Sequence, residues 1–217
     1  MKKILITVTA LIFTTASAFA GVNVGISGAF TMLDTSGTQT LKSSGKKSST
    51  SKEEDVIVPS IFIEFESEAG VAVGLDYVPL EAEMGSGTRT DDDEETSGNN
   101  KASAELSDHM TIYALLPLGN FYVKAGIARA TVDTTETLAT GTTYGNEDVD
   151  GRMIGFGLDR DLDNGLFFRA EATYTDYDSV KFSGSFNGNA AGDSAVRNVV
   201  DGDVDATALR ISIGKSF

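Results

Sequence analysis

The stretch Phe121-Tyr122-Val123-Lys124-Ala125-Gly126-Ile127 decides the fold, because apolar and polar residues alternate along it with a period of two. Such alternation puts successive side chains on opposite faces of a β-strand. One face of this strand is apolar, and the other carries small or charged residues. The pattern indicates a sheet that meets a different environment on each side.

The same alternation recurs along the 217-residue chain, in segments 22–32, 57–65, 71–79, 106–116, 152–160, 166–177 and 207–217. Each is about 9–12 residues long, as a tilted membrane-spanning strand requires. Between them, short turns rich in Gly and Asn at 67–70, 117–120 and 162–165 alternate with long polar connectors at about 33–56, 81–105, 133–151 and 178–206. Outer-membrane barrels alternate short turns and long loops in this way. The sequence therefore predicts an all-β fold, an eight-stranded antiparallel up-and-down transmembrane β-barrel.

The two faces can be assigned to lipid and lumen. Small residues such as Gly126 and Gly157 lie on the polar face, as the narrow interior of eight strands requires. Aromatic residues of the apolar face gather near the strand ends and would form two girdles: Phe65, Phe121, Phe168 and Phe217 near the short turns, and Phe30, Tyr77 and Tyr174 nearer the long loops. We therefore expect the apolar face to contact lipid. A soluble, lipocalin-like barrel with the apolar face inside is the alternative.

The first residues are typical of an export signal. Lys2 and Lys3 precede an apolar run over 4–13, and Ala18-Phe19-Ala20 supplies small residues at the cleavage site. We expect a cleaved signal peptide at 1–20 and a mature barrel at 21–217. Beyond the signal, no apolar run has the roughly 20 residues of a spanning helix.

Composition excludes several function classes. The chain has no Cys, which excludes disulfide scaffolds and cysteine metal sites. Its net charge is −15 and its pI is about 4.3, so no nucleic acid is expected as a partner.

The chain resembles the eight-stranded outer-membrane barrels of the OmpA/OmpX/opacity-protein type in its signal peptide, its eight alternating segments and its ending, Leu209-Arg210-Ile211-Ser212-Ile213-Gly214-Lys215-Ser216-Phe217. The resemblance implies the outer membrane of a Gram-negative cell envelope, with lipid and lipopolysaccharide as surroundings. The ending is similar to the signal that the outer-membrane assembly machinery reads, with Leu209, Ile211, Ile213 and Phe217 as its apolar positions and Lys215 as a departure from the pattern. The resemblance transfers fold and location but no particular activity.

Charged residues on the lumen face predict a structural network formed by Glu64, Asp76, Lys124, Asp159, Arg169, Glu171 and Arg210. Opposite charges in a narrow, poorly hydrated interior should pair, because an unpaired buried charge is costly. Such a network would stabilise the barrel and close it. Separate hydration of each charge in a wet lumen is the alternative.

Other polar groups give weaker signals. Ser107 and His109 would lie side by side in the lumen, but a hydrolase also needs an orienting group and an oxyanion site. Acidic runs at 91–95, 147–150 and 201–205 fit solvated loops that would bind divalent cations only weakly. The sequence thus predicts no catalytic residue, no cofactor and no specific metal site.

These observations favour a non-enzymatic outer-membrane barrel that serves envelope integrity or surface interaction through acidic extracellular loops. A narrow pore for small solutes is the first alternative, and an envelope hydrolase centred on His109 is the second.

Overall fold

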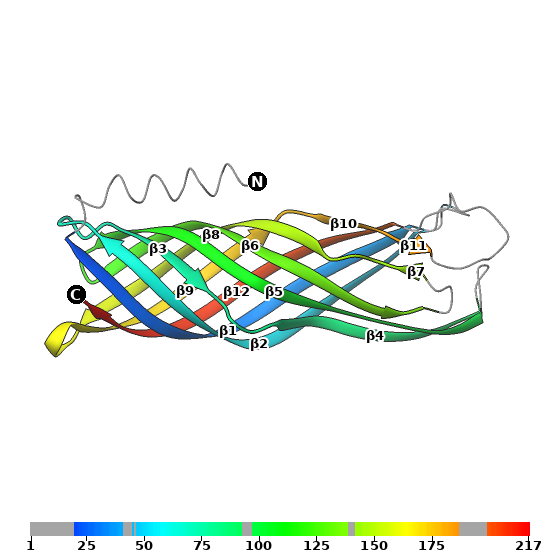
Figure 1. The fold of residues 1–217 in the computed structure, drawn as a ribbon, viewed down its shortest axis with the longest axis horizontal. Coiled ribbons are helices and arrows are strands. Elements are labelled where there is room, and N and C mark those ends of the chain that lie inside the picture. The colour runs from blue at the N-terminus through cyan, green and yellow to red at the C-terminus, as the bar shows by residue number, and fades with distance from the viewer. Residues whose placement is uncertain (1–19, 41–44, 46, 93–96, 139–141, 187–198) are drawn as a thin grey trace.

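The protein is an elongated barrel of strongly tilted strands (Figure 1). The computed structural model describes residues 20–40, 45, 47–92, 97–138, 142–186 and 199–217. The expected signal peptide lies outside these residues except for Ala20, so it stays a prediction. Among the described residues, no helix is long and apolar enough to cross a membrane.

Eight strands form a closed antiparallel ring, as the sequence predicts. In order around the ring they are β1 (Gly21–Thr40), β2 (Lys47–Glu66), β3 (Ala72–Tyr77), β5 (Ser97–Leu118), β6 (Phe121–Thr137), β8 (Glu147–Asp161), β9 (Leu166–Tyr177) and β12 (Val199–Ser216). Pairing of β1 with β12, from Asn23 opposite Ser216 to Thr40 opposite Val199, closes the ring. This pairing leaves neither β1 nor β12 as a free sheet edge in the lipid, where an unpaired backbone group would find no partner.

Four further strands lie outside the ring. After β3 the chain continues into β4 (Ala82–Asp92), which pairs with β5. After β9 it continues into β10 (Val180–Ser183), which pairs with β12. A small separate ladder joins β7 (Thr142–Thr143) to β11 (Ser185–Phe186).

Three tight connections lie together at one end of the barrel, which we call the turn end. Gly70 and Gly119 adopt the left-handed backbone conformation there, with φ of 77° and 71°. The third connection contains the short 3-10 helix η2 (Asp163–Gly165), in which Asn164 has φ of 65°. Gly and Asn are the residues that adopt this conformation most readily, so the turn chemistry agrees with the expected turns.

Where the structure describes them, the four segments expected to be long loops are largely strand, which corrects the sequence prediction. The ladder between β1 and β2 extends to Thr40 opposite Lys47, and that between β5 and β6 extends to Lys101 opposite Thr137. The acidic runs at 147–150 and 201–205 lie within β8 and β12. Of the run at 91–95, Asp91 and Asp92 end β4, and 93–95 lie outside the described residues. The part of the barrel built from these extensions is called the hairpin end below.

At the turn end the two faces are as predicted. The outward side chains are apolar and exposed, including Ile26 at 60%, Ile57 at 81%, Ile127 at 66% and Ile211 at 58%. The inward face is polar, small or aromatic. On the outward face, Phe121 stacks on Phe156 of the neighbouring strand, with ring centroids 5.5 Å apart.

Leu106 is the exception, because it points inward and is 6% exposed, whereas the alternation places it outward. The register between β5 and β6 shifts between Ser107 and Met110, and Asp108 has φ of 49°. This β-bulge adds a residue and reverses the alternation on its far side.

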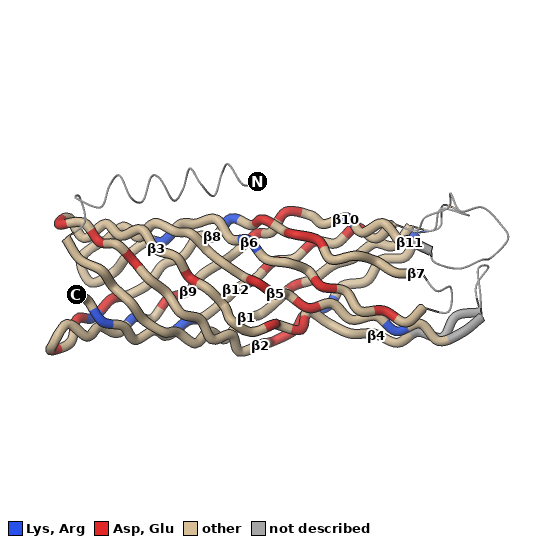
Figure 2. Tube along the Cα trace, viewed as in Figure 1, with Lys and Arg blue, Asp and Glu red and all other residues tan. Residues whose placement is uncertain are grey.

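The apolar exterior ends at a common level. On most strands of the ring the next outward residue is charged and exposed: Asp34, Asp55, Asp108, Arg129, Arg152 and Asp176. In Figure 2, Asp and Glu positions recur along the hairpin end, which carries the labels β4, β7 and β10. We take this level as the boundary between a lipid-facing belt and a water-facing extension.

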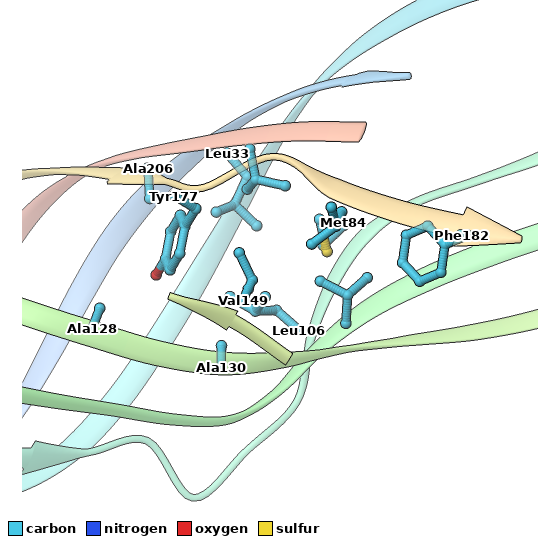
Figure 3. Packing of buried hydrophobic residues seen from close by; sticks show 12 residues of the cluster. Leu33, Met84, Leu106, Ala128, Ala130, Val149, Tyr177, Phe182 and Ala206 are labelled. Carbon is cyan, nitrogen blue, oxygen red and sulfur yellow. The ribbon is translucent and has the colours of Figure 1, made fainter. Parts of the chain in front are cut away.

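The interior of the hairpin end is an apolar core, shown in Figure 3. It includes Leu33, Val132 and Val149, each 2% exposed, together with Val204 and Phe182. These side chains meet across the tube, and their burial explains why the polar extensions form strands instead of loops.

Candidate functional site

Aromatic rings fill much of the lumen because each lies against a glycine. Five inward rings are directly opposite a glycine of the neighbouring strand: Phe62 with Gly25, Tyr113 with Gly74, Tyr122 with Gly157, Phe167 with Gly214, and Tyr177 with Gly151. A Cβ atom at any of these glycines would overlap with the facing ring. The small residues noted in the sequence therefore make room for specific rings. Phe167 and these pairings were not predicted.

The charged residues of the lumen form two groups, and the first surrounds Arg169. Its Nη1 atom lies 2.6 Å from Oε1 of Glu64, and its Nε atom lies 2.7 Å from Oδ2 of Asp159. The Glu64 and Arg169 side chains are only 1% and 8% exposed. The guanidinium lies over the Phe167 ring, 4.4 Å from its centroid. Arg169 is therefore held between two carboxylates and an aromatic ring.

The second group lies deeper along the lumen and has Arg210 at its centre. Nη1 of Arg210 donates to Oδ2 of Asp76 at 2.5 Å, and its Nε atom is 3.9 Å from Oε1 of Glu171. Glu171 also accepts a hydrogen bond of 3.1 Å from Nζ of Lys124. The Ser60 hydroxyl donates to Asp76 at 2.8 Å. Each buried charge in this group thus has an opposite charge within reach.

Two tyrosines connect the groups. The Tyr113 hydroxyl donates to Glu64 at 2.8 Å, and Nζ of Lys124 lies 3.9 Å from the centroid of the Tyr113 ring. The Tyr122 hydroxyl donates to Glu171 at 2.9 Å. Tyr122 also carries the Arg169 guanidinium over its ring at 5.6 Å.

The structure places the seven predicted lumen charges in these two groups. The structural role predicted for the network, to stabilise and close the barrel, stays a prediction. The sequence analysis did not predict that Tyr113 and Tyr122 link the two groups, because the contacts depend on how the strands pair.

Two cavities end at this network from opposite sides. The turn-end cavity, about 370 Å³, is lined by Arg169, Tyr122 and Asp159 among others. The cavity on the hairpin side, about 60 Å³, has Arg210 and Thr111 in its lining. They share no lining residue. The network therefore lies between two separate compartments of the lumen.

The structure separates the residues of the hydrolase alternative. The Ser107 hydroxyl donates to the Asp133 carboxylate, and the His109 ring packs edge-on against Tyr177, with centroids 6.3 Å apart. Asp108, between them, is exposed on the outer surface. Among the residues that the structure describes, Ser107 and His109 share no hydrogen bond.

The apolar positions of the C-terminal signal lie on the lipid face. Leu209, Ile211 and Ile213 are 59%, 58% and 49% exposed, and Phe217 is 72% exposed. The Phe217 amide donates to the Val22 carbonyl at 2.9 Å, so the last residue continues the closing ladder. Recognition by the assembly machinery stays a prediction.

Four carboxylates form a row across adjacent strands at the hairpin end. Asp34 lies directly opposite Glu53 on one side and Asp205 on the other, and Asp205 lies opposite Asp176. Like charges in this arrangement repel. In the part of the chain that the structure describes, no group of three or more His, Asp or Glu is arranged to hold a metal ion. Weak cation binding stays a prediction.

Comparison with known proteins shows the fold. No protein-family model and no curated protein sequence matches the chain. Among solved structures, the outer membrane protease OmpT of Escherichia coli is 8% identical, with 91% of this chain and 97% of that chain covered and a TM-score of 0.55. Ail, the attachment invasion locus protein of Yersinia pestis, is 10% identical over 90% of this chain and 98% of that chain, with a TM-score of 0.42. Outer membrane protein AlkL is 13% identical over 91% of this chain and 90% of that chain, with a TM-score of 0.46.

At such low identity the likeness concerns architecture only. The chain has the fold of an outer-membrane β-barrel, and that prediction is confirmed.

Proposed function

We propose that this outer-membrane barrel is non-enzymatic and serves surface interaction or envelope integrity through its hairpin end. The observation that carries the proposal is the construction of that end: a rigid strand extension with an apolar core and charged outward residues. Such an extension holds its outer face in a fixed shape, so a partner binds without ordering a flexible loop.

The charge of the outer face favours some partners over others. The row of Glu53, Asp34, Asp205 and Asp176 gives part of the extension a local negative field. A basic protein surface, or cations that accompany lipopolysaccharide phosphates, would be attracted to it.

The narrow-pore alternative requires a continuous aqueous path. The Arg169 and Arg210 groups lie between the two lumen cavities, and the side chains of Glu64, Asp76, Lys124 and Glu171 are all less than 7% exposed. We therefore expect the wild-type protein to be electrically silent in a planar bilayer. Steady unitary conductance would favour the pore.

The orientation can be tested with single cysteines, because the natural chain has none. Ser51→Cys lies in the exposed hairpin end of β2, and Asn120→Cys lies in a short turn. We expect a membrane-impermeant maleimide to label the first variant on intact cells and the second only after the outer membrane is opened. Labelling of Asn120→Cys alone on intact cells would reverse the orientation and contradict the proposal.

The surface role is tested by changing only outward residues, since deletion of a hairpin would also remove part of the apolar core. A variant with Asp148, Asp150 and Asp203 replaced by Ser should fold, as judged by heat-modifiable gel mobility. In the native cell it should lose surface binding or become sensitive to envelope stress. A matched variant with the turn residues Asp161 and Asp163 replaced by Ser should keep both properties. Equal behaviour of the two variants in every assay would contradict the proposal.

A further inference from the structure

The cavity on the hairpin side of the network is mostly apolar. Its volume is about 60 Å³, and its walls include Val56, Val58, Leu80 and Met153. Its polar groups come from Arg210, His109, Tyr177 and four threonines, Thr31, Thr111, Thr173 and Thr175. An apolar cavity binds water poorly and favours apolar guests.

One wall of this cavity is a gap in the barrel sheet. Pairing between β2 and β3 ends where Ile61 lies opposite Tyr77. Farther along, through described residues on both sides, β2 pairs only with β1 and β4 pairs only with β5. Val56 and Val58 line the cavity from one side of the gap, and Leu80 lines it from the other.

Backbone chemistry explains why the sheet does not close here. Two of the three prolines of the chain, Pro59 and Pro79, flank the gap, and neither has an N–H group to donate across it. The amide of Val78 donates to the His109 carbonyl at 3.0 Å, toward β5 and away from β2. Farther out, Nζ of Lys52 on β2 donates to the Ser86 carbonyl on β4 at 2.9 Å. The gap is thus a window between the Ile61–Tyr77 pair and the Lys52–Ser86 contact.

The window opens at the level of the lipid-facing belt. Ile57 on its β2 side is 81% exposed, and Leu80 on the other side is 58% exposed. Ile57 lies opposite Phe30, which in turn lies opposite Leu209, and both of these are outward belt residues. A guest that entered between Ile57 and Leu80 would therefore come from the membrane.

We propose that the window admits the end of a linear aliphatic chain from the membrane into this cavity. The apolar walls and mouth provide the attraction. The small volume selects the shape, because it is less than half of the roughly 150 Å³ cavity that accepts benzene. The paired charges around Arg210 form a polar floor that stops the chain. The site therefore binds a chain end but passes nothing across the barrel.

The proposal depends on the membrane location of the belt and not on the proposed surface role. The chain could belong to a membrane lipid or to a free fatty acid, because both present the same methylene groups. Two probes distinguish these sources. One is a phospholipid with a diazirine at the end of its acyl chain, and the other is a free fatty acid with the same terminal group.

The experiment uses the full mature barrel refolded into vesicles that contain one probe, followed by irradiation and mapping of the cross-links by mass spectrometry. We expect cross-links on the inward residues Val58 and Met153, in addition to the outward residues Ile57 and Ile154 that any bilayer probe would reach. Cross-linking of Val58 and Met153 by one probe and not the other identifies the source. Cross-links confined to outward residues with both probes would overturn the proposal.

Substitutions make the test specific for the cavity. Ala208→Phe fills it from β12, whereas Ala172→Phe, directly across from Leu209, adds the same ring to the lipid face. We expect Ala208→Phe to lower inward cross-linking roughly tenfold. The added ring would remove the space for about two methylene groups, and their burial accounts for about that change in binding. Ala172→Phe should leave inward cross-linking unchanged.

If Ala208→Phe does not fold, Leu80→Asp at the exposed mouth takes its place, since a charge there should exclude an aliphatic chain. Inward cross-linking that persists in the folded filling variant, or in Leu80→Asp, would overturn the proposal. Neither result depends on which side of the membrane the hairpin end faces or on any binding partner.

Discussion

The turn end and the hairpin end of this barrel consist of the same tilted strands, but their faces have opposite chemistry. At the turn end, Ile26 and Ile211 point outward while Glu64 and Arg169 are buried inside. At the hairpin end, Leu33 is buried inside, and charged and hydroxyl residues lie on the outside. Apart from local bulges, the same alternate positions point inward throughout.

The difference shows that the surrounding solvent sets the composition of each face. Lipid accepts apolar side chains on the exterior and leaves the narrow lumen to paired charges and rings. Water reverses the arrangement, because apolar groups then gain free energy only by moving inside. The stability of each end should therefore depend on different interactions, and paired substitutions can test this.

The largest difference should come from truncating one leucine at each location. Leu33→Ala removes a buried side chain of the hairpin core, and we expect a loss of about 2–5 kcal/mol in the free energy of unfolding. Leu209→Ala changes a lipid-facing residue, where a leucine contributes only about 0.3–0.6 kcal/mol. Urea unfolding of both variants in lipid vesicles measures the difference. Equal losses would mean that the hairpin interior is not a packed core.

Breaking an ion pair should have the opposite effect, with the larger loss of stability at the turn end. Arg169→Ala leaves Glu64 and Asp159 without their shared partner, and we expect a loss of about 2–4 kcal/mol because one of these carboxylates is fully buried. Arg129→Ala breaks an exposed pair with Asp150 at the hairpin end, where both side chains are about half exposed, and should cost at most about 1 kcal/mol.

Bilayer recordings on the same two proteins examine closure. Arg169→Ala should acquire a small conductance, and Arg129→Ala should stay silent. An Arg169→Ala protein as stable and as silent as the wild type would show that other groups hold and close the lumen.

The sequence predicted the turn end well because alternation is unambiguous when one face is strongly apolar. The alternation also assigns Glu64 and Arg169 to the polar face of clear strands, and both side chains are buried in the structure. The hairpin end was read as loops because its inward residues occur singly between charges. Val149 lies between Asp148 and Asp150, and the triplet appears acidic although Val149 is 2% exposed.

Local geometry also limited what could be predicted from the sequence. The bulge at Asp108 reverses the alternation over a single residue, and composition gave no sign of it. The window beside Pro59 depends on which strands meet across the ring, and a single strand does not contain that information. These features arise from tertiary contacts, which override local propensity.

A third comparison concerns close packing between ring and glycine. Gly157→Ala would place a methyl group against the Tyr122 ring at the turn end, and we expect a loss of about 1–3 kcal/mol from the resulting displacement. Gly37→Ala at the hairpin end has its nearest neighbour at 3.9 Å and should change stability by less than about 0.5 kcal/mol. Thermal unfolding in detergent micelles is sufficient for both. A larger loss of stability in Gly37→Ala than in Gly157→Ala would show that the backbone is packed more tightly at the hairpin end, against this expectation.

The smallest effect, and the only gain, should come from the carboxylate row. Asp34 faces Glu53 and Asp205 across two ladders, so Asp34→Asn removes two repulsive contacts and keeps the side-chain shape. We expect stabilisation of about 0.2–1 kcal/mol in low salt, and the gain should shrink as salt screens the remaining charges. Asp201→Asn is the matched control, because Asp201 pairs with Lys181 at 3.0 Å and the loss of this pair should be neutral or slightly destabilising.

Urea unfolding at low and high ionic strength, with and without Mg²⁺, measures the stability of both variants. If Mg²⁺ removes the advantage of Asp34→Asn by stabilising the wild type, the row binds the cation weakly, as the sequence suggested. If Asp34→Asn is destabilising under every condition, the carboxylates are not in conflict, and the outer face of the hairpin end is organised by attractive contacts instead.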